Sequence, residues 1–432
     1  MANGTDADTF LELSTWGSAG AIAEPIRPSA DPTFVDCPWY RCWVLEQLQG
    51  QPQHLLQCLP DVDFDKEANW TTYLVPFWDK VRELVLAPGS KDINSIADTI
   101  IKVNLVDIKN NYEGHQSVKN LVFAVLGWQT MLYKPDFSRV TGEYAILNEM
   151  DGFAGEARVC LRQLEMVGRN SLPEFLLGFG MMLPPQNYCA FEASEQQALF
   201  TETKVVVSKE INAHVLSKVC GVRFQWVDSL SCHLELDTRS NTLFVFRYPS
   251  FCVSSIRQNE SPSAKDDHKS VIHCCVLEEP GFIQWADEED VTDLLREILL
   301  SYRLIFGQNK RSRAQFRKLR PFSCVPDGQD QLLSQLCGRK RFDCPMPLTE
   351  RDEYDLIRDF PHLRSRIVRL SGYASSKRPR SIRQLWEDKR DSTAWLAFWS
   401  VLIFGSATIF LALIQTVFQI LQYIDGLQNS QN

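Results

Sequence analysis

The hydrophobic pattern of the chain changes character near its C-terminus. Residues 395–414 read WLAFWSVLIFGSATIFLALI, twenty residues without a charged side chain. At about 1.5 Å per residue, a helix of this length spans about 30 Å, the thickness of the hydrocarbon core of a bilayer. The alternative, a buried helix of a soluble domain, rarely stays apolar for so long. The pattern predicts a single transmembrane helix within residues 392–424, followed by a short polar tail, residues 425–432.

One stripe of this apolar helix is predicted to be small and polar. Its residues are spaced alternately three and four apart, as at the a and d positions of a heptad. They are Gly405, Thr408, Ala412, Gln415, Gln419 and Gln422. Small residues let membrane helices approach closely, and a glutamine amide in hydrocarbon needs a hydrogen-bond partner. The stripe favours self-association or pairing with another membrane helix, unless Gln415 and the residues after it already lie in the hydrated headgroup region.

Before the apolar helix, the first half of the chain has a mostly helical pattern. Residues 1–35 are predicted to be a flexible leader, because GSAGAIAEPIRPSADPTFV is rich in Gly, Ala, Ser and Pro. Residues 36–220 form the mainly helical part of a soluble domain, since apolar positions recur there at helical spacing. The expected helices cover residues 40–48, 74–86, 93–106, 115–132 and 154–165.

Residues 221–320 have a strand pattern that gives way to a long helix. The segments 222–227, 232–236 and 242–248 are rich in β-branched and aromatic residues, and a turn over 237–241 joins the last two into a hairpin. The polar stretch 254–270 predicts a loop, and 271–277 a further strand. Helical spacing returns from residue 290. The predicted fold class is therefore α+β, predominantly helical, with a small antiparallel sheet and one C-terminal transmembrane helix.

Charge is distributed unevenly along the chain. The formal net charge is -9, and it divides into about -18 for residues 1–300 and about +9 for residues 301–432. The acidic part argues against nucleic acid as a partner. The juxtamembrane region, residues 321–391, places positive charge next to the membrane helix, where anionic lipid would meet it. The residues nearest the helix are Lys377, Arg378, Arg380, Arg383, Lys389 and Arg390.

These flanking charges also predict an orientation. Because bases precede the span and only Asp425 follows it, the positive-inside rule places the large N-terminal part in the cytosol. Fewer than twenty residues follow the span, which predicts post-translational insertion and a tail-anchored, single-pass protein. No secretory signal is expected, since Met1–Asp8 holds two acids and no base. The thirteen cysteines are then expected to be reduced thiols.

A second basic run lies earlier in the chain, over residues 310–320. It contains Lys310, Arg311, Arg313, Arg317, Lys318 and Arg320. Such a run is either the solvated face of a helix or a surface that binds lipid.

Motifs that would indicate an enzyme are absent from the sequence. There is no GxxxxGK[ST], GxGxxG, GxSxG or HExxH pattern, so no cofactor is expected. The DVDFD segment at 61–65 resembles the start of a calcium loop, but Lys66 and Thr72 stand where Gly and Glu belong. Cys232, His233, Cys252 and the residues 273–275 lie on predicted strands, yet no CxxC pair supports a zinc site. Cys252 with His233 or His273 stays open as a nucleophile pair.

Three segments carry a resemblance to a known family. They are HLELD at 233–237, LFVFRYPSFC at 243–252 and KRPRSIRQLWEDKRDSTAWLAFWSVLIFG at 377–405. They resemble a family of uncharacterised proteins of filamentous fungi over most of residues 115–424. The resemblance implies a basic, Trp-containing juxtamembrane segment and a Gln-rich membrane helix, and it implies no activity. The layout is also distantly similar to CorA-type magnesium channels, but the second membrane helix and the Gly-Met-Asn signature are missing, which argues against ion transport.

Three classes of function fit this sequence. The first is a membrane-anchored cytosolic protein that acts through protein contacts and touches membrane lipid. The second is an oligomeric, channel-like protein in which the polar stripe lines a path through a helix bundle. The third is a membrane-surface enzyme of an unrecognised type, which a convergent polar pocket would favour.

Overall fold

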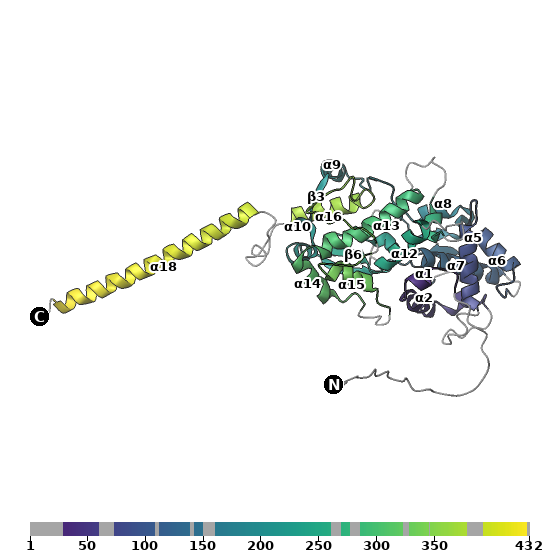
Figure 1. Ribbon diagram of the computed structural model, residues 1–432, viewed down its shortest axis with the longest axis horizontal. Helices are drawn as coiled ribbons and strands as arrows, with labels where there is room; N and C mark the ends of the chain where they lie inside the picture. The colour runs from purple at the N-terminus through teal and green to yellow at the C-terminus, as the bar shows by residue number, and fades with distance from the viewer. Residues whose placement is uncertain are drawn as a thin grey trace, which may run out of the picture.

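The computed structural model describes a globular part and one long C-terminal helix, α18 (Ser392–Asn429) (Figure 1). The described residues are 29–59, 73–108, 112–138, 142–149, 160–260, 269–276, 286–322, 328–344, 346–377 and 392–429. Helices dominate, and the strands are short. The predicted α+β, predominantly helical class is confirmed.

Four of the first helices, α2, α5, α6 and α7, lie where the sequence predicts them, whereas the short α1 and α3 were not predicted. Asp92 begins one of them with a capping box, in which its Oδ1 accepts from the backbone N–H of Ser95 at 2.9 Å. That helix ends at Lys102, short of the predicted residue 106, and Asn104 follows with a φ of 56°. The helices are α1 (Thr33–Asp36), α2 (Tyr40–Gln49), α3 (Gln53–Leu56), α5 (Val75–Leu86), α6 (Ile93–Lys102) and α7 (Tyr112–Thr130).

The described part of the predicted leader is packed against the globular part. Asp31 is 3% exposed, and its carboxylate accepts from the indole Nε1 of Trp78 at 3.0 Å and from the backbone of Thr33 at 2.9 Å. The Phe34 ring lies 5.0 Å from that of Tyr40. Residues 29–35 therefore belong to the fold, because a polar anchor and an aromatic contact hold a segment whose composition alone is typical of a linker.

A short strand replaces the end of a predicted helix. The pattern over 154–165 predicted a helix, but 162–164 form a strand that pairs antiparallel with residues 143–145, and 154–159 lie outside the described residues. The pairing buries Tyr144 completely, opposite Gln163. The elements here are β1 (Glu143–Ala145), β2 (Arg162–Leu164), η2 (Glu165–Arg169), α8 (Leu172–Leu177), α9 (Ser194–Glu202), β3 (Val205–Val207), α10 (Ser208–Ile211) and α11 (Ala213–Lys218).

A three-stranded sheet lies inside the globular part, in the order β4-β6-β5. The predicted hairpin is present only as the short antiparallel pair of β5 and β6, whereas β4 and β6 run parallel. Every residue of β6 is buried, which explains why it carries no polar alternation. The elements are β4 (Arg223–Val227), η3 (Leu230–Cys232), β5 (Leu236–Asp237) and β6 (Thr242–Phe246).

Helices follow the sheet where a loop and a strand were expected. α12 (Pro249–Glu260) includes the first residues of the predicted loop, 254–270, and packs on α13 (Glu288–Tyr302). The predicted strand 271–277 is wrong, since η5 (Val271–Cys275) is a 3-10 helix. The helix predicted from residue 290 is confirmed as α13. The remaining elements are η6 (Arg303–Gly307), α14 (Lys310–Leu319), α15 (Gln331–Gly338), β7 (Glu353–Asp355), α16 (Arg364–Ser376).

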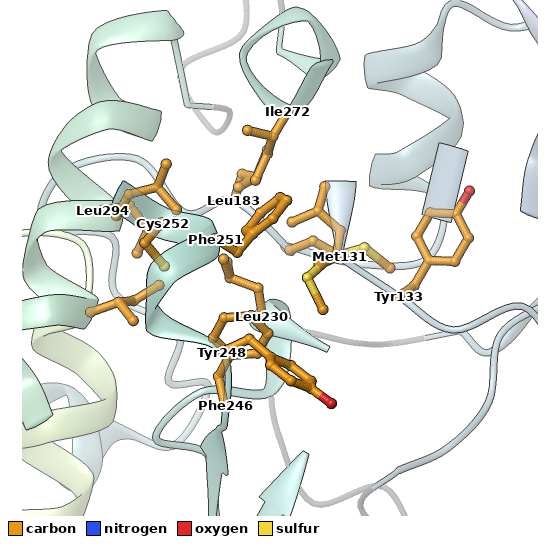
Figure 2. Packing of buried hydrophobic residues seen from close by; sticks show 14 of the residues in the cluster. Met131, Tyr133, Leu183, Leu230, Phe246, Tyr248, Phe251, Cys252, Ile272 and Leu294 are labelled. Carbon is orange, nitrogen blue, oxygen red and sulfur yellow. The ribbon is translucent and has the colours of Figure 1, made fainter. Parts of the chain in front are cut away.

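One cluster of buried hydrophobic side chains runs from Cys37 to Ala374. Figure 2 shows a part of it, in which side chains from α12, α13, η3 and η5 meet those that follow α7. Segments far apart in the sequence close this core. The Trp39 ring stacks on that of Tyr248 at 3.9 Å, and the hydroxyl of Ser254 donates to Asp36 at 2.8 Å.

A buried arginine joins η6 to the end of α15. Arg303 is fully buried, its Nη1 donates to the carbonyls of Leu336 and Arg339, and its Nε donates to Glu350 at 2.5 Å. Gly307, one turn later, has no room for a side chain, because a Cβ there would overlap the Arg303 guanidinium and lie 2.5 Å from the Leu336 carbonyl oxygen. This contact holds α15 close to η6 and fixes the position of the residues that follow α15.

Candidate functional site

The C-terminal helix α18 exposes a long apolar surface. Its segment Trp395–Ile424 is long and apolar enough to cross a membrane, and none of its most apolar window is buried. Every residue from Val401 to Ile424 is exposed. Figure 1 shows α18 as a long helix outside the globular part. Contiguous apolar surfaces of this size mark membrane or protein interaction sites in folded proteins. The predicted span, residues 395–414, lies wholly inside this helix.

The exposed segment is longer than a bilayer requires. Thirty residues at about 1.5 Å each measure about 45 Å, against a hydrocarbon core of about 30 Å. Helix tilts of up to about 40° absorb only part of this excess. If Trp395 lies at the near interface, an upright helix places Gln415 at the far edge of the hydrocarbon core. A tilt of about 40° lengthens the path through the core to about 39 Å and keeps Gln415 and Gln419 within it.

The predicted small and polar stripe lies on this exposed helix. A Cβ on Gly405 would meet nothing within 4 Å, so packing within the described chain gives no reason for a glycine. The Thr408 hydroxyl donates to the Gly405 carbonyl at 2.8 Å and is satisfied inside the helix. By contrast, the amides of Gln415, Gln419 and Gln422 have no hydrogen-bond partner among the described residues.

Of the six juxtamembrane basic residues, the structure describes Lys377 alone. Lys377 directly follows α16, and its Nζ lies 4.6 Å from the centroid of the Tyr373 ring. The other five, Arg378, Arg380, Arg383, Lys389 and Arg390, lie outside the described residues, as does the DVDFD segment.

The candidate cysteines and histidines are used by the core. His233 is fully buried, its Nε2 is 2.7 Å from the Ser301 hydroxyl, and its Nδ1 accepts from the Phe246 backbone. His273 bonds instead to Thr292 at 3.0 Å. Within the described ranges, no group of three His, Cys, Asp or Glu side chains is placed to hold a metal ion. The structure does not bring these residues together.

Burial raises the pKa values of the core thiols and so makes them less reactive. Burial raises the pKa of Cys252 well above its usual value, and the same cause raises that of Cys37 to about 12. A nucleophilic cysteine needs the opposite shift, toward the thiolate. All twelve cysteines that the structure describes are free. The Cys252 nucleophile hypothesis therefore finds no support in the geometry.

Two buried carboxyls have raised pKa values but structural partners. Burial raises the pKa of Glu297 well above its usual value, and its oxygens accept from the backbone N–H groups of His362 at 3.0 Å and Leu363 at 2.8 Å. Burial also raises the pKa of Asp330 to about 6, and this carboxyl caps α15 by accepting from Leu332 at 2.9 Å. Such bonds fix chain segments, and neither carboxyl lines the two clefts described next.

Two open clefts lie on the globular part. The first, about 460 Å³, is lined by Lys209, Gln308, Glu350, Arg351 and Asp352, among others. Its charges are partly paired, since Glu350 bonds to Arg303 and Arg351 bonds to Asp359 at 2.8 Å. The second, about 480 Å³, lies between α14 and α15 and includes Arg317 and Arg320 from the predicted basic run.

The basic run divides between structural and exposed residues. Arg313 is buried, and its Nη1 donates to the carbonyls of Gly307 at 2.6 Å and Gln308 at 2.9 Å, so it fixes the start of α14. Arg317, Lys318 and Arg320 are exposed. The sequence did not single out Arg339, which joins the second cleft from α15. Its signal was the basic segment Gly338-Arg339-Lys340-Arg341, which periodicity alone does not connect with α14.

No protein-family model, curated protein or solved structure matches this chain. Its function is therefore inferred from the exposed helix, the clefts and the charges described above.

Proposed function

We propose that this protein is a membrane-anchored cytosolic protein that acts through contacts with other proteins and is held to the membrane by α18. One observation carries the proposal. Sixteen large apolar side chains between Leu396 and Ile424 are exposed along one helix. Moving these side chains from water into the hydrocarbon core is favourable by roughly 25 cal/mol for each Å² of apolar surface that leaves water.

The orientation follows from the charges that flank the helix. Before the span, the juxtamembrane region contributes Lys377 and the five basic residues after it. From residue 392 to residue 432, the one charged side chain is Asp425, which follows the span. Basic residues are retained on the cytosolic side of membrane helices. The globular part, with its free thiols, would accordingly face a reducing compartment.

The first test combines extraction with topology. In cells that express the chain with a glycosylation sequon added after Asn432, we expect the protein to stay in the membrane pellet in alkaline carbonate. We also expect the added sequon to be glycosylated and the native sequons at Asn3, Asn69 and Asn259 to stay unmodified. Release by carbonate would show that α18 does not anchor the chain. Glycans on the native sequons would reverse the orientation.

The stripe on α18 supports pairing of membrane helices. Gly405 has open space where a Cβ would stand, and three glutamine amides have no partner among the described residues. A second helix against this stripe would approach closely at Gly405 and accept the amide hydrogen bonds. The repeat of three and four residues keeps the stripe on one side of the helix over its whole length.

Substitutions on this stripe should weaken self-association. Gln415→Leu removes an interhelical hydrogen bond worth about 0.6–2 kcal/mol. We therefore expect the dissociation constant of the dimer to rise roughly 3-fold to 30-fold. Gly405→Leu should have at least as large an effect, because the larger side chain separates the helices. The measurement is energy transfer between labelled chains in neutral lipid vesicles. Ala407→Leu, which lies off the stripe, is the matched control, and equal behaviour of all four proteins would refute pairing along this face.

A further inference from the structure

A cleft on the globular part concentrates unpaired positive charge. It lies between α14 and α15, encloses about 480 Å³, and is lined among others by Phe316, Arg317, Arg320, Phe322, Ser334 and Arg339. No aspartate or glutamate contributes to its described lining. A volume of this size holds a small polar molecule of headgroup dimensions.

The three arginines of the cleft differ from exposed arginines of the fold that are held in ion pairs. Arg296 pairs with Asp293 at 2.8 Å, and Arg351 pairs with Asp359 at the same distance. Over the part of the chain that the structure describes, Arg317, Arg320 and Arg339 have no ion pair and donate no side-chain hydrogen bond. Three guanidinium groups around one cleft repel one another until an anion lies between them.

The ends of α14 and α15 determine where these arginines leave the backbone. Arg317 projects from the last turn of α14, and Arg320 ends that helix in the left-handed region, with φ 43° and ψ 68°. This conformation is uncommon for a residue with a Cβ, and it turns the chain sharply at the rim of the cleft. Arg339 follows α15 directly, and its carbonyl accepts from the Nη1 of buried Arg303 at 2.8 Å.

Two aromatic rings give the cleft a rigid floor. Phe316 is 4% exposed and packs edge-on against Trp226, with ring centroids 5.9 Å apart. Phe322 is 7% exposed and lies 5.7 Å from the Tyr248 ring. Because both rings belong to the hydrophobic core, the apolar wall of the cleft is already in place before a ligand binds. Preorganisation of this kind lowers the cost of binding.

We propose that the cleft between α14 and α15 binds clustered phosphate groups through Arg317, Arg320 and Arg339. The planar guanidinium group matches phosphate oxygens in a two-point contact, and the absence of an acid from the described lining favours a ligand with several negative charges. Exposed Ser334 supplies a further hydroxyl donor from α15.

The anchored state of the protein brings one source of such phosphates close. Residues 377–391 join α16 to α18 and measure about 50 Å when fully extended. If α18 lies in a bilayer, which is the proposed function, then the end of α16 stays within about 50 Å of a surface that carries lipid headgroups. A soluble polyphosphate has the same chemistry, and the experiment below distinguishes the two sources.

The test uses the full chain in nanodiscs of phosphatidylcholine alone, titrated with labelled inositol hexakisphosphate. The cleft variant is Arg317→Gln with Arg320→Gln and Arg339→Gln. Its matched control is Lys310→Gln with Lys318→Gln and Lys340→Gln, which removes the same charge from exposed residues outside the cleft lining. We expect wild type and control to bind within 3-fold of each other, and the cleft variant to bind at least 10-fold more weakly.

Two results would overturn the proposal: no binding by wild type, or equal weakening of both triple variants, which would indicate diffuse attraction. If the glutamine variant loses its thermal transition, the same three positions changed to lysine keep the charge and remove the planar group. That variant should fold and bind 3-fold to 10-fold more weakly, and unchanged binding would contradict the assigned arginine geometry.

A second titration identifies the source of the phosphate. Nanodiscs that contain phosphatidylinositol bisphosphate should displace the labelled probe from wild type when the site accepts lipid, and leave it bound when the site accepts soluble ligands alone. Binding of the soluble probe can also be measured without the anchor, because detergent-solubilised chain should bind it equally well if the cleft is correct. Failure of carbonate resistance with intact probe binding would reject the membrane function and keep the cleft.

Discussion

Replacing Arg303 by methionine should lower the free energy of unfolding by about 3–5 kcal/mol, the largest effect that we expect from a single substitution. Arg303 is fully buried, and its guanidinium donates to the carbonyls of Leu336, Arg339 and Lys340 and to the Glu350 carboxylate. Methionine fills a similar volume but donates nothing, so these acceptors lose their partner. The ring of Phe342, 4.2 Å from the guanidinium carbon, loses a cation–π contact as well.

Chemical denaturation of the full chain in detergent, followed by tryptophan fluorescence, measures this effect. Arg296→Met is the matched control, because Arg296 is 45% exposed and its pairs with Glu260 and Asp293 lie at the surface. Exposed pairs contribute about 0–1 kcal/mol. A similar decrease in the free energy of unfolding for both variants would show that the buried contacts of Arg303 stabilise the fold no more than a surface ion pair does.

Acidification from pH 7 to pH 5 should destabilise the protein through His273 by about 2 kcal/mol. Burial, and secondly the charge of Lys269, lower the pKa of His273 from 6.5 to about 3. The folded protein therefore keeps this ring neutral, while the unfolded chain binds a proton below pH 6.5. Stability from this group is present above pH 6.5 and is lost as the pH falls toward 3. Burial lowers the pKa of His233 in the same direction.

The measurement compares wild type with His273→Gln, since other groups oppose the trend. Burial raises the pKa of Asp330 to about 6, so that carboxyl favours the folded state as the pH falls from 6 toward 4. We expect the stability of wild type relative to His273→Gln to fall by about 2 kcal/mol between pH 7 and pH 5. His54→Gln removes an exposed histidine and is the control. Parallel curves for wild type and His273→Gln would contradict the prediction.

The sequence was sufficient where a pattern is local and repeated. α5, α7, α13 and the apolar α18 were all predictable, because each presents a continuous helical stripe or an uninterrupted apolar run. α12 was misread as the start of a loop for a physical reason. Its polar residues Ser254 and Gln258 are buried, and they bond to Asp36 and Thr33, more than two hundred residues earlier. Polar residues with distant buried partners look like surface residues in the sequence.

Other features depend on tertiary neighbours. The run 271–275 is apolar and short, and such runs do not distinguish a strand from a helical turn. The parallel pairing of β4 with β6 joins segments that are separated by β5, so a hairpin was the simpler prediction. The phosphate cleft shares this property. Arg317 and Arg339 lie on different helices, and their proximity follows from the contact of Arg303 with the end of α15.

The stacking of Trp39 on Tyr248 has a consequence for biosynthesis. A ribosome adds about 5–20 residues per second, so roughly 10–40 s separate the synthesis of these two residues. During that interval α1 lacks the surface of α12 on which it packs, and the apolar side chains of Trp39, Tyr40 and Trp43 have no completed core. We therefore expect newly made N-terminal segments of this protein to be prone to aggregation, and depletion of chaperones that act during translation to lower the amount of soluble protein.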